Sequence, residues 1–241
     1  SGTCSPNATS NGALLTVNQN TTITLAPVAA TGCEASTVQY TVTAVGTGLT
    51  YQWQEDDGGG FANIANGGIY AGATTTTLVL TGITSAMHGY DYRVVVSGGC
   101  GPNQTSAGVN LTVNESPEIT VQPVNSTICE TTNTSFTVDA GVTTAPAYQW
   151  QESTNGGSSY ANIVNGGIYA GATTATLTLT GVPLGHNGYL YRAIVSGTCS
   201  PNATSNGALL TVNQNTTITL APVAATGCEA STVQYTVTAV G

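Results

Sequence analysis

Hydrophobic and polar residues alternate along much of the chain, which is typical of β-strands that bury one face. In residues 37–44, Val38, Tyr40, Val42 and Ala44 fall on one side and polar residues fall on the other. The alternation recurs at residues 51–53, 78–80, 92–96, 109–113, 136–140, 148–150 and 177–179. Glycine- and asparagine-rich turns separate these stretches. The pattern predicts an all-β protein made of two-sheet sandwiches, each with about seven short strands.

The chain repeats itself on two levels. Residues 1–46 are identical to residues 196–241, so the period is 195 residues. Each period is itself double, because YQWQE and NGGIYAGATT both occur twice within it. We therefore predict four parts. They are the last strand of a preceding domain (1–18), a complete type A domain (19–114), a complete type B domain (115–213) and the first strands of a further type A domain (214–241).

Composition narrows the classes of partner. Charged residues make up 5% of the chain, lysine is absent, the net charge is −9, and the only basic side chains are Arg93 and Arg192. Nucleic acid or an anionic membrane would need a positive patch, so neither is expected as a partner. No apolar run approaches the length of a membrane span, so no membrane insertion is expected in this segment. These features favour an extracellular protein, cell-surface attached or secreted.

One order of aromatic residues carries a resemblance to a known fold. In each domain a tryptophan, Trp53 or Trp150, precedes a Gly-Tyr-X-Tyr motif that ends at Tyr92 or Tyr191. This order resembles the immunoglobulin-like (Ig-like) fold, which implies that the four residues belong to the core and that Tyr92 and Tyr191 are its tyrosine-corner residues. The resemblance implies Ig-like sandwiches arranged end to end.

A narrower resemblance covers essentially the whole chain. The motifs YQWQ, NGGIYAGATT, GYxYR and VSGxC together are similar to the tandem Ig-like repeats of giant surface proteins of the Bacteroidota. Those proteins are exported by the type IX secretion system and include adhesins linked to gliding. The resemblance implies a cell-surface protein.

The six cysteines depart from the vertebrate Ig pattern. Val42 and Val94 stand where a disulfide would cross the core of the first domain. In the Ig-like fold the second and sixth strands run in the same direction, so Cys33 and Cys100 would lie at opposite ends of their domain. At about 3.3 Å per residue their separation is roughly 50 Å, far beyond the roughly 7 Å limit between bonded Cα atoms. A bond within one domain is therefore excluded.

We predict instead a disulfide between successive domains, joining Cys33 to Cys199. The remaining cysteines would bond to preceding domains (Cys4 and Cys100) or to following domains (Cys129 and Cys228). Two alternatives stay open, namely six reduced, half-buried thiols and bridges between separate chains.

Candidate catalytic and metal-binding residues do not recur together. His88 aligns with Asn187, and His186 aligns with Met87, so the two domains do not share a set of catalytic residues. We therefore expect both histidines to lie at the surface or to stabilise a turn. We do not expect an enzyme. The acidic turn at 55–59 has oxygen ligands that Ca²⁺ prefers, but its counterpart reads ESTNGG. We therefore expect a solvated turn there, with no metal and no cofactor.

Two functions remain. The first is a structural fibre or adhesin stalk, stiffened by disulfides at its joints, whose partners are neighbouring repeats and a cell or abiotic surface. Side-by-side bundling of chains stays open, because lysine, which commonly guards strand edges, is absent. The second is a multivalent glycan- or ligand-binding module in which Tyr70 and Tyr169 form aromatic platforms, although a tyrosine folded back onto its own sheet explains the same residues.

Overall fold

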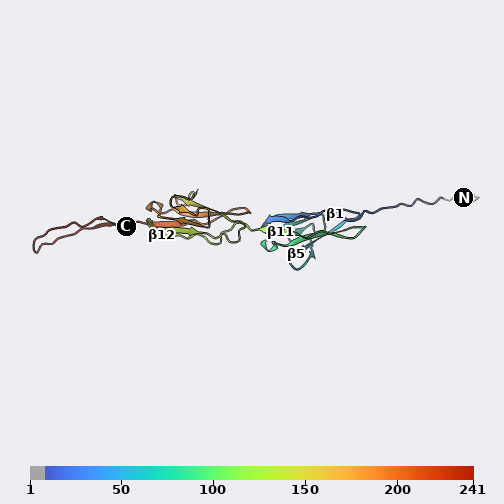
Figure 1. The fold of residues 1–241 in the computed structure, drawn as a ribbon, viewed down its shortest axis with the longest axis horizontal. Coiled ribbons are helices and arrows are strands. Elements are labelled where there is room, and N and C mark those ends of the chain that lie inside the picture. Colours follow the sequence, from blue (N-terminus) through green and yellow to red (C-terminus); the bar gives the residue numbers. More distant parts are fainter. Residues whose placement is uncertain (1–8) are drawn as a thin grey trace, which may run out of the picture. The chain divides into compact units, whose positions relative to one another are not determined.

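The computed structural model describes residues 9–241, which fall into two compact units, one ending at Val113 and the other beginning at Asn114. Both units are built from β-strands (Figure 1). Each also carries one three-residue 3-10 helix, η1 (Ser85–Met87) or η2 (Leu184–His186). The prediction of an all-β, two-sheet architecture is confirmed.

Unit 1 consists of two facing sheets. One contains, in spatial order, β3 (Thr37–Thr41), β8 (Thr77–Thr81) and β7 (Tyr70–Ala71), and next to it β1 (Thr22–Leu25) pairs with β4 (Thr43–Val45). The other contains β2 (Ala30–Cys33), β11 (Val109–Asn114), β9 (Asp91–Ser97), β5 (Thr50–Asp56) and β6 (Ala62–Asn63), with β10 (Gln104–Thr105) also on β9. The first segment of the domain thus divides between the sheets, as β1 and β2.

Unit 2 repeats this plan. One sheet contains β13 (Thr134–Thr137), β17 (Thr176–Leu179) and β16 (Tyr169–Ala170). The other contains β12 (Ser126–Cys129), β20 (Ala208–Asn213), β18 (Leu190–Ser196), β14 (Ala147–Ser153) and β15 (Ala161–Asn162), with β19 (Ala203–Thr204) on β18. A further pair, β21 (Thr217–Leu220) with β22 (Thr238–Val240), follows near the end of the chain.

Each unit has its own hydrophobic core around one tryptophan. Trp53 and Trp150 are both fully buried. Beside Trp53, the rings of Tyr40 and Tyr92 stack with their centroids 5.0 Å apart. In unit 2, Phe136 and Tyr191 stack in the same way at 4.9 Å. The four residues Trp53, Trp150, Tyr92 and Tyr191 therefore lie where a core role would place them.

One of the two outer strands is very short in each of four sheets. β6, β7, β15 and β16 each have two residues. A two-residue strand exposes few unpaired N–H and C=O groups, so it protects a sheet edge from pairing with another chain without the help of charged side chains. At these four edges, the absence of lysine does not leave a long strand open to pairing.

Tyr40 is 1% exposed and Leu210 is 0% exposed, because both side chains meet the other strands of their sandwich. The hydrophobic alternation determines which face a strand can bury, but only the partner strands bury it.

The hydroxyl of Tyr40 is buried without a hydrogen-bond partner in the described residues, and burial raises its pKa. Because Phe136 occupies the equivalent place in unit 2, we expect Tyr40→Phe to stabilise unit 1 by about 1 kcal/mol. Urea titration followed by the NMR amide signals of each unit measures this. The matched control Phe136→Tyr should destabilise unit 2, and a loss of stability in Tyr40→Phe would contradict the prediction.

Candidate functional site

Two cysteines, at the ends of β2 and β12, lie where the chain leaves each unit. We call this end of a unit its C-terminal pole. Cys33 ends β2 and Cys129 ends β12, and each strand pairs with the last strand of its sandwich. In unit 2 the pairing is parallel and places Cys129 opposite Asn213, the final residue of β20. The Glu130 N–H donates to the Asn213 carbonyl oxygen (2.9 Å), which holds the turn after Cys129 against the outgoing chain.

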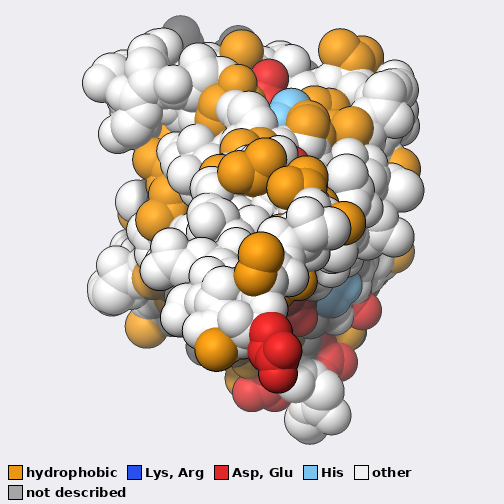
Figure 2. All heavy atoms as spheres, turned by 90° about the vertical axis from the view of Figure 1, so that its left-hand side faces the viewer, with side chains coloured by type: hydrophobic (Ala, Val, Ile, Leu, Met, Phe, Trp, Pro, Cys, Tyr) orange, Lys and Arg blue, Asp and Glu red, His pale blue; other side chains and the backbone are white. Residues whose placement is uncertain are grey.

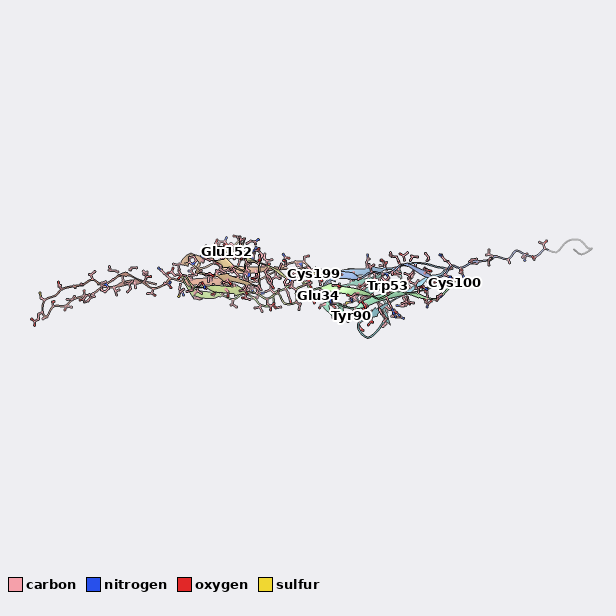
Figure 3. All side chains as sticks on the ribbon, viewed as in Figure 1. Glu34, Trp53, Tyr90, Cys100, Glu152 and Cys199 are labelled. Atoms are coloured by element: carbon pink, nitrogen blue, oxygen red, sulfur yellow. The ribbon has the colours of Figure 1, made fainter. Side chains whose placement is uncertain are left out.

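The cysteines after β9 and β18 lie where the chain enters each unit, here called the N-terminal pole. The Thr21 N–H donates to the Cys100 carbonyl (3.1 Å), and the Cys100 sulfur lies 3.1 Å from Asn20 Oδ1. The Cys199 sulfur lies 3.5 Å from the Asn114 carbonyl oxygen. Figure 3 shows Cys100 at one end of unit 1 and Glu34, the neighbour of Cys33, at the other, with Trp53 between them.

The oxidation states of the cysteines differ. Cys33 and Cys199 are disulfide-bonded, whereas Cys100, Cys129 and Cys228 are free thiols. Cys33 is therefore not bonded to Cys100, in agreement with the exclusion of a bond within one domain, and the alternative of six reduced thiols does not hold for Cys33 and Cys199. The prediction for Cys4 lies outside the described residues.

A carboxylate and two tyrosines form a cluster within each sandwich. In unit 1, the hydroxyls of Tyr70 (β7) and Tyr92 (β9) both donate to Glu55 Oε2 on β5. The distance from the Tyr92 oxygen to Glu55 Oε2 is 2.6 Å. In unit 2, Tyr169 donates to Glu152 Oε2 (2.5 Å), and its oxygen lies 3.2 Å from that of Tyr191. Because Tyr70 and Tyr169 come from one sheet and the glutamates from the other, each cluster ties the two sheets together.

The clusters bear on the two interpretations of Tyr70 and Tyr169. Both side chains are half-buried, and burial together with the hydrogen bond to the glutamate raises the pKa of each phenol above its ordinary value. Hydroxyls that point inward to a carboxylate are not available to an external ligand. The geometry favours tyrosines folded back onto their own sheet over aromatic platforms.

The tyrosine-corner interpretation needs correction. The Tyr92 hydroxyl donates to a glutamate side chain on the neighbouring strand, whereas a tyrosine corner bonds to backbone a few residues upstream. The reason is that Glu55 faces inward and supplies a stronger, charged acceptor within reach. Tyr191 likewise lies against the Tyr169 hydroxyl. Both tyrosines are core residues with side-chain partners, and burial is the main cause of the raised pKa of each.

The turn before the sixth strand explains why His88 aligns with Asn187. Nδ1 of His88 accepts a hydrogen bond from the Val113 N–H (3.1 Å), and Oδ1 of Asn187 accepts one from the Val212 N–H (3.0 Å). Histidine and asparagine thus perform the same task, which is to hold the last strand of the unit. This is the turn-stabilising role that the sequence suggested.

His186 has a different environment from its counterpart Met87. Its ring lies 4.8 Å from the ring of Tyr189, and its Nδ1 is buried without a hydrogen-bond partner among the described residues. Burial lowers the pKa of His186, opposed in part by the negative charge of Glu152.

The acidic turn uses its oxygens internally. Asp56 Oδ1 accepts hydrogen bonds from the Gly58 and Gly60 N–H groups, both at 2.9 Å. In unit 2, Ser153 accepts from the Gly157 N–H (2.9 Å) in the corresponding loop. Within residues 9–241 no group of three or more His, Cys, Asp or Glu side chains could hold a metal ion.

Both basic side chains are held against the protein surface. Arg93 stacks on Phe61 at 3.8 Å from the ring centroid, Arg192 stacks on Tyr160 at 3.7 Å, and each Nε donates to a glutamine of the adjacent strand. Figure 2 shows hydrophobic side chains spread among uncharged polar ones, with only a few acidic groups in view. No helix in the described part of the chain is long and apolar enough to cross a bilayer.

Comparison with known proteins defines the class. A family described as a domain of unknown function, DUF8696, matches residues 119–214, and no curated protein matches the chain. The I-band fragment I67–I69 of titin is similar with a TM-score of 0.65 and 16% identity, over 86% of this chain and 70% of the fragment. These findings place the chain in the class of tandem Ig-like β-sandwich domains.

Two further solved structures agree. The Rst D1–D2 structure has a TM-score of 0.55 and 17% identity, over 81% of this chain and 100% of that one. The insect immune protein hemolin, described in connection with homophilic adhesion, has a TM-score of 0.51 and 15% identity, over 81% of this chain and 47% of hemolin. At these identities the likeness concerns the fold alone.

Because His88 and Asn187 both accept a backbone hydrogen bond, we expect position 88 to tolerate asparagine but not alanine. We expect His88→Asn to leave the stability of unit 1 nearly unchanged at neutral pH, and His88→Ala to cost about 1 kcal/mol because the Val113 N–H loses its acceptor. Urea titration read from unit 1 amide signals measures both. Equal losses in the two variants would show that the hydrogen bond is not what the position requires.

The lowered pKa of His186 predicts a loss of stability in acid. In the unfolded chain the pKa of histidine has its ordinary value of 6.5, whereas in the folded unit the pKa of His186 is lower. The contribution of His186 to the stability of unit 2 is therefore complete above pH 6.5. It is lost as the pH falls from 6.5 to the lower pKa of the folded state, because the unfolded chain takes up the proton first. Urea midpoints of unit 2 at a series of pH values measure the decline. His186→Met, which copies unit 1, should flatten it, and an unchanged profile in that variant would contradict the assignment.

Proposed function

We propose that the chain is a segment of an extracellular structural fibre or adhesin stalk in which Cys33 and Cys199 are bonded to each other, so that successive Ig-like domains are tied twice. The observation that supports this most is the combination of oxidation and position. Cys33 is oxidised at the C-terminal pole of unit 1, and Cys199 is oxidised at the N-terminal pole of the next unit. Among the other described cysteines, all are free thiols.

Chain connectivity makes this pairing reasonable without any further contact. The chain leaves unit 1 after β11, the strand that pairs with the cysteine-bearing β2, and enters unit 2 at Asn114, beside the Cys199 sulfur. One peptide connection therefore links the pole that carries Cys33 to the pole that carries Cys199. A disulfide at such a joint restricts the swing that a single linker allows.

The consequence is mechanical. A string of domains linked by peptide alone can bend at every joint, whereas joints that are closed by both peptide and sulfur transmit bending and tension to the sandwiches. Inside each sandwich, the glutamate–tyrosine cluster and the buried tryptophan hold the sheets together. Reach from repetition and stiffness from the joints are the properties that a fibre or stalk needs.

The disulfide also bears on location. Structural disulfides persist in oxidising surroundings outside the cytosol, which supports an extracellular site, cell-surface attached or secreted. The similarity of the repeat motifs to the surface proteins of the Bacteroidota supports the same location and an adhesin stalk in particular. Its partners are then the neighbouring repeats, neighbouring chains and the surface that the adhesin meets.

The second candidate, a glycan- or ligand-binding module, receives less support. Its platforms would be formed by Tyr70 and Tyr169, but both hydroxyls are bound to glutamates inside their own units. The fibre is therefore the function that the geometry supports best.

Proteolysis without reduction, followed by mass spectrometry, tests the joint directly. We expect one linked peptide that contains Cys33 and Cys199. NMR relaxation of the full chain should then show the two units tumbling together, and the double variant Cys33→Ser/Cys199→Ser should let them tumble separately. The double variant is the matched control because neither cysteine belongs to the core cluster around Trp53 or to the one around Trp150.

Two results would overturn the proposal. One is a linked peptide that pairs Cys33 or Cys199 with another cysteine, such as Cys4. The other is equal tumbling of the two units in the oxidised chain and in the double variant, which would mean that the disulfide does not restrict the joint.

A further inference from the structure

Asparagines that begin an Asn-X-Ser/Thr triplet are frequent in this chain, and such a triplet can accept an N-linked sugar when X is not proline. In the described residues the triplets begin at Asn20, Asn103, Asn110, Asn114, Asn125, Asn133, Asn202 and Asn215. A chain so rich in asparagine and threonine contains triplets by chance, so the motif alone selects no site. The structure separates them by the surroundings of each asparagine side chain.

Most of these asparagines already serve the fold. Asn114 is half-buried at the end of β11. Five others use the side-chain amide in a hydrogen bond of 2.8 to 3.4 Å, namely Asn20, Asn110, Asn125, Asn133 and Asn215. An amide that is bonded to the fold or half-buried in a strand is poorly placed to carry a bulky group.

Asn103 and Asn202 have different surroundings. Both are exposed, and neither side chain has a hydrogen-bond partner among the described residues. Each stands directly before a short strand, β10 or β19, in the turn that follows β9 or β18. Asparagine in a turn commonly bonds to nearby backbone, but these two do not, so the turn does not depend on their side chains.

The same triplet occurs in both types of unit. The turn reads CGPNQTS at residues 100–106 and CSPNATS at residues 199–205, so its second and fifth residues differ while the asparagine and threonine are kept. None of the other described triplets has a counterpart in the other type of unit. The pair Asn103 and Asn202 is therefore singled out by the repeat as well as by exposure.

The next residue of the turn shows what a structural reason for recurrence looks like. Ser106 and Ser205 are buried, and each hydroxyl oxygen accepts a hydrogen bond from a backbone N–H of β9 or β18, at 3.1 Å and 2.8 Å. Thr105 and Thr204 are instead exposed, and their hydroxyls have no partner in the part of the chain that the structure describes. The fold explains the serine, whereas recognition from outside explains why asparagine and threonine are kept together.

The composition of the surface gives an independent reason for a hydrophilic modification. Charged residues are 5% of this chain, against about 25% in typical soluble domains. The only two basic side chains are stacked on aromatic rings, and apolar side chains such as Val142 are exposed. An N-linked sugar is bulky and solubilising, so it supplies the hydration that charged side chains supply on other surfaces.

We propose that Asn103 and Asn202 are N-glycosylation sites, so that each of the two units carries a sugar on the turn before β10 or β19. The donor is a sugar activated as a diphosphate ester. A bond forms between Nδ2 of the asparagine and the anomeric carbon, and the bond from that carbon to the diphosphate oxygen breaks. Nδ2 gives up one proton, and the diphosphate leaves with the bonding electrons.

This inference goes beyond the proposed joint between domains. It rests on the export of the chain, which the proposed function includes, but not on the bond between Cys33 and Cys199. The two proposals can therefore fail separately.

The test uses the protein purified from the cells that naturally produce it. After digestion, mass spectrometry with electron-transfer fragmentation keeps the sugar on its residue. We expect a sugar on the Asn103 peptide and on the Asn202 peptide, whose sequence the copy at Asn7 shares, and none on the five hydrogen-bonded asparagines. A single sugar indicates a nucleotide-linked donor, and a preassembled oligosaccharide indicates a lipid-linked one.

Two variants made in the same cells test the triplet itself. Thr105→Ala should remove the sugar from Asn103 and leave the one on Asn202, whereas Thr105→Ser should keep both. Because the Thr105 side chain is exposed and has no hydrogen-bond partner in the described residues, we expect both variants to fold. Urea titration of unit 1 checks this.

Three results would overturn the site: unmodified Asn103 and Asn202, a sugar on Asn103 that survives Thr105→Ala, or sugars mainly on the hydrogen-bonded asparagines. The Cys33–Cys199 peptide is sought in the same digest. Its presence without a sugar overturns the glycosylation sites and leaves the proposed joint standing. A sugar without that peptide does the reverse.

Discussion

Each sandwich depends on one buried tryptophan that binds both of its sheets. Trp53 lies on β5, yet its backbone N–H donates to the Ala73 carbonyl and its indole N–H donates to the Thr75 carbonyl, both at 2.9 Å, in the segment that leads into β8 of the facing sheet. Trp150 makes the equivalent bonds in unit 2, at 2.8 Å and 2.9 Å. The largest side chain of the core is thus also the one whose polar groups set the registration of the sheets, since a buried indole N–H needs a partner.

This arrangement explains where the cysteines are useful. The sheets are already joined across the core by the tryptophan and by the glutamate–tyrosine cluster, and Val42 and Val94 fill the positions of a cross-core disulfide with apolar packing. Sulfur atoms are instead found at the two poles, where strands end and the chain passes from one unit to the next. In the proposed pairing, a bond placed there would act on the joint between domains more than on the stability of either domain.

Differences between the two units show which properties each position requires. His88 and Asn187 are chemically unlike, but both accept a hydrogen bond from the last strand. Asp56 and Ser153 likewise both accept from glycine N–H groups in the loop after the tryptophan strand. At these positions the backbone demands an acceptor at a certain place rather than a particular residue, so the alignment of unlike residues is not a sign of chemistry at a surface.

The sequence by itself determined the strands, the repeat and the core face, because alternation with a period of two shows directly which side chains a sheet can bury, as with Val38, Tyr40 and Val42. It also excluded a bond between Cys33 and Cys100, because the length of a strand separates them. Only the tertiary structure decided where the polar groups of the aromatic residues go, since Glu55, Tyr70 and Tyr92 come from three strands that are distant in sequence. Local pattern specifies a face, and partner strands supply its surroundings.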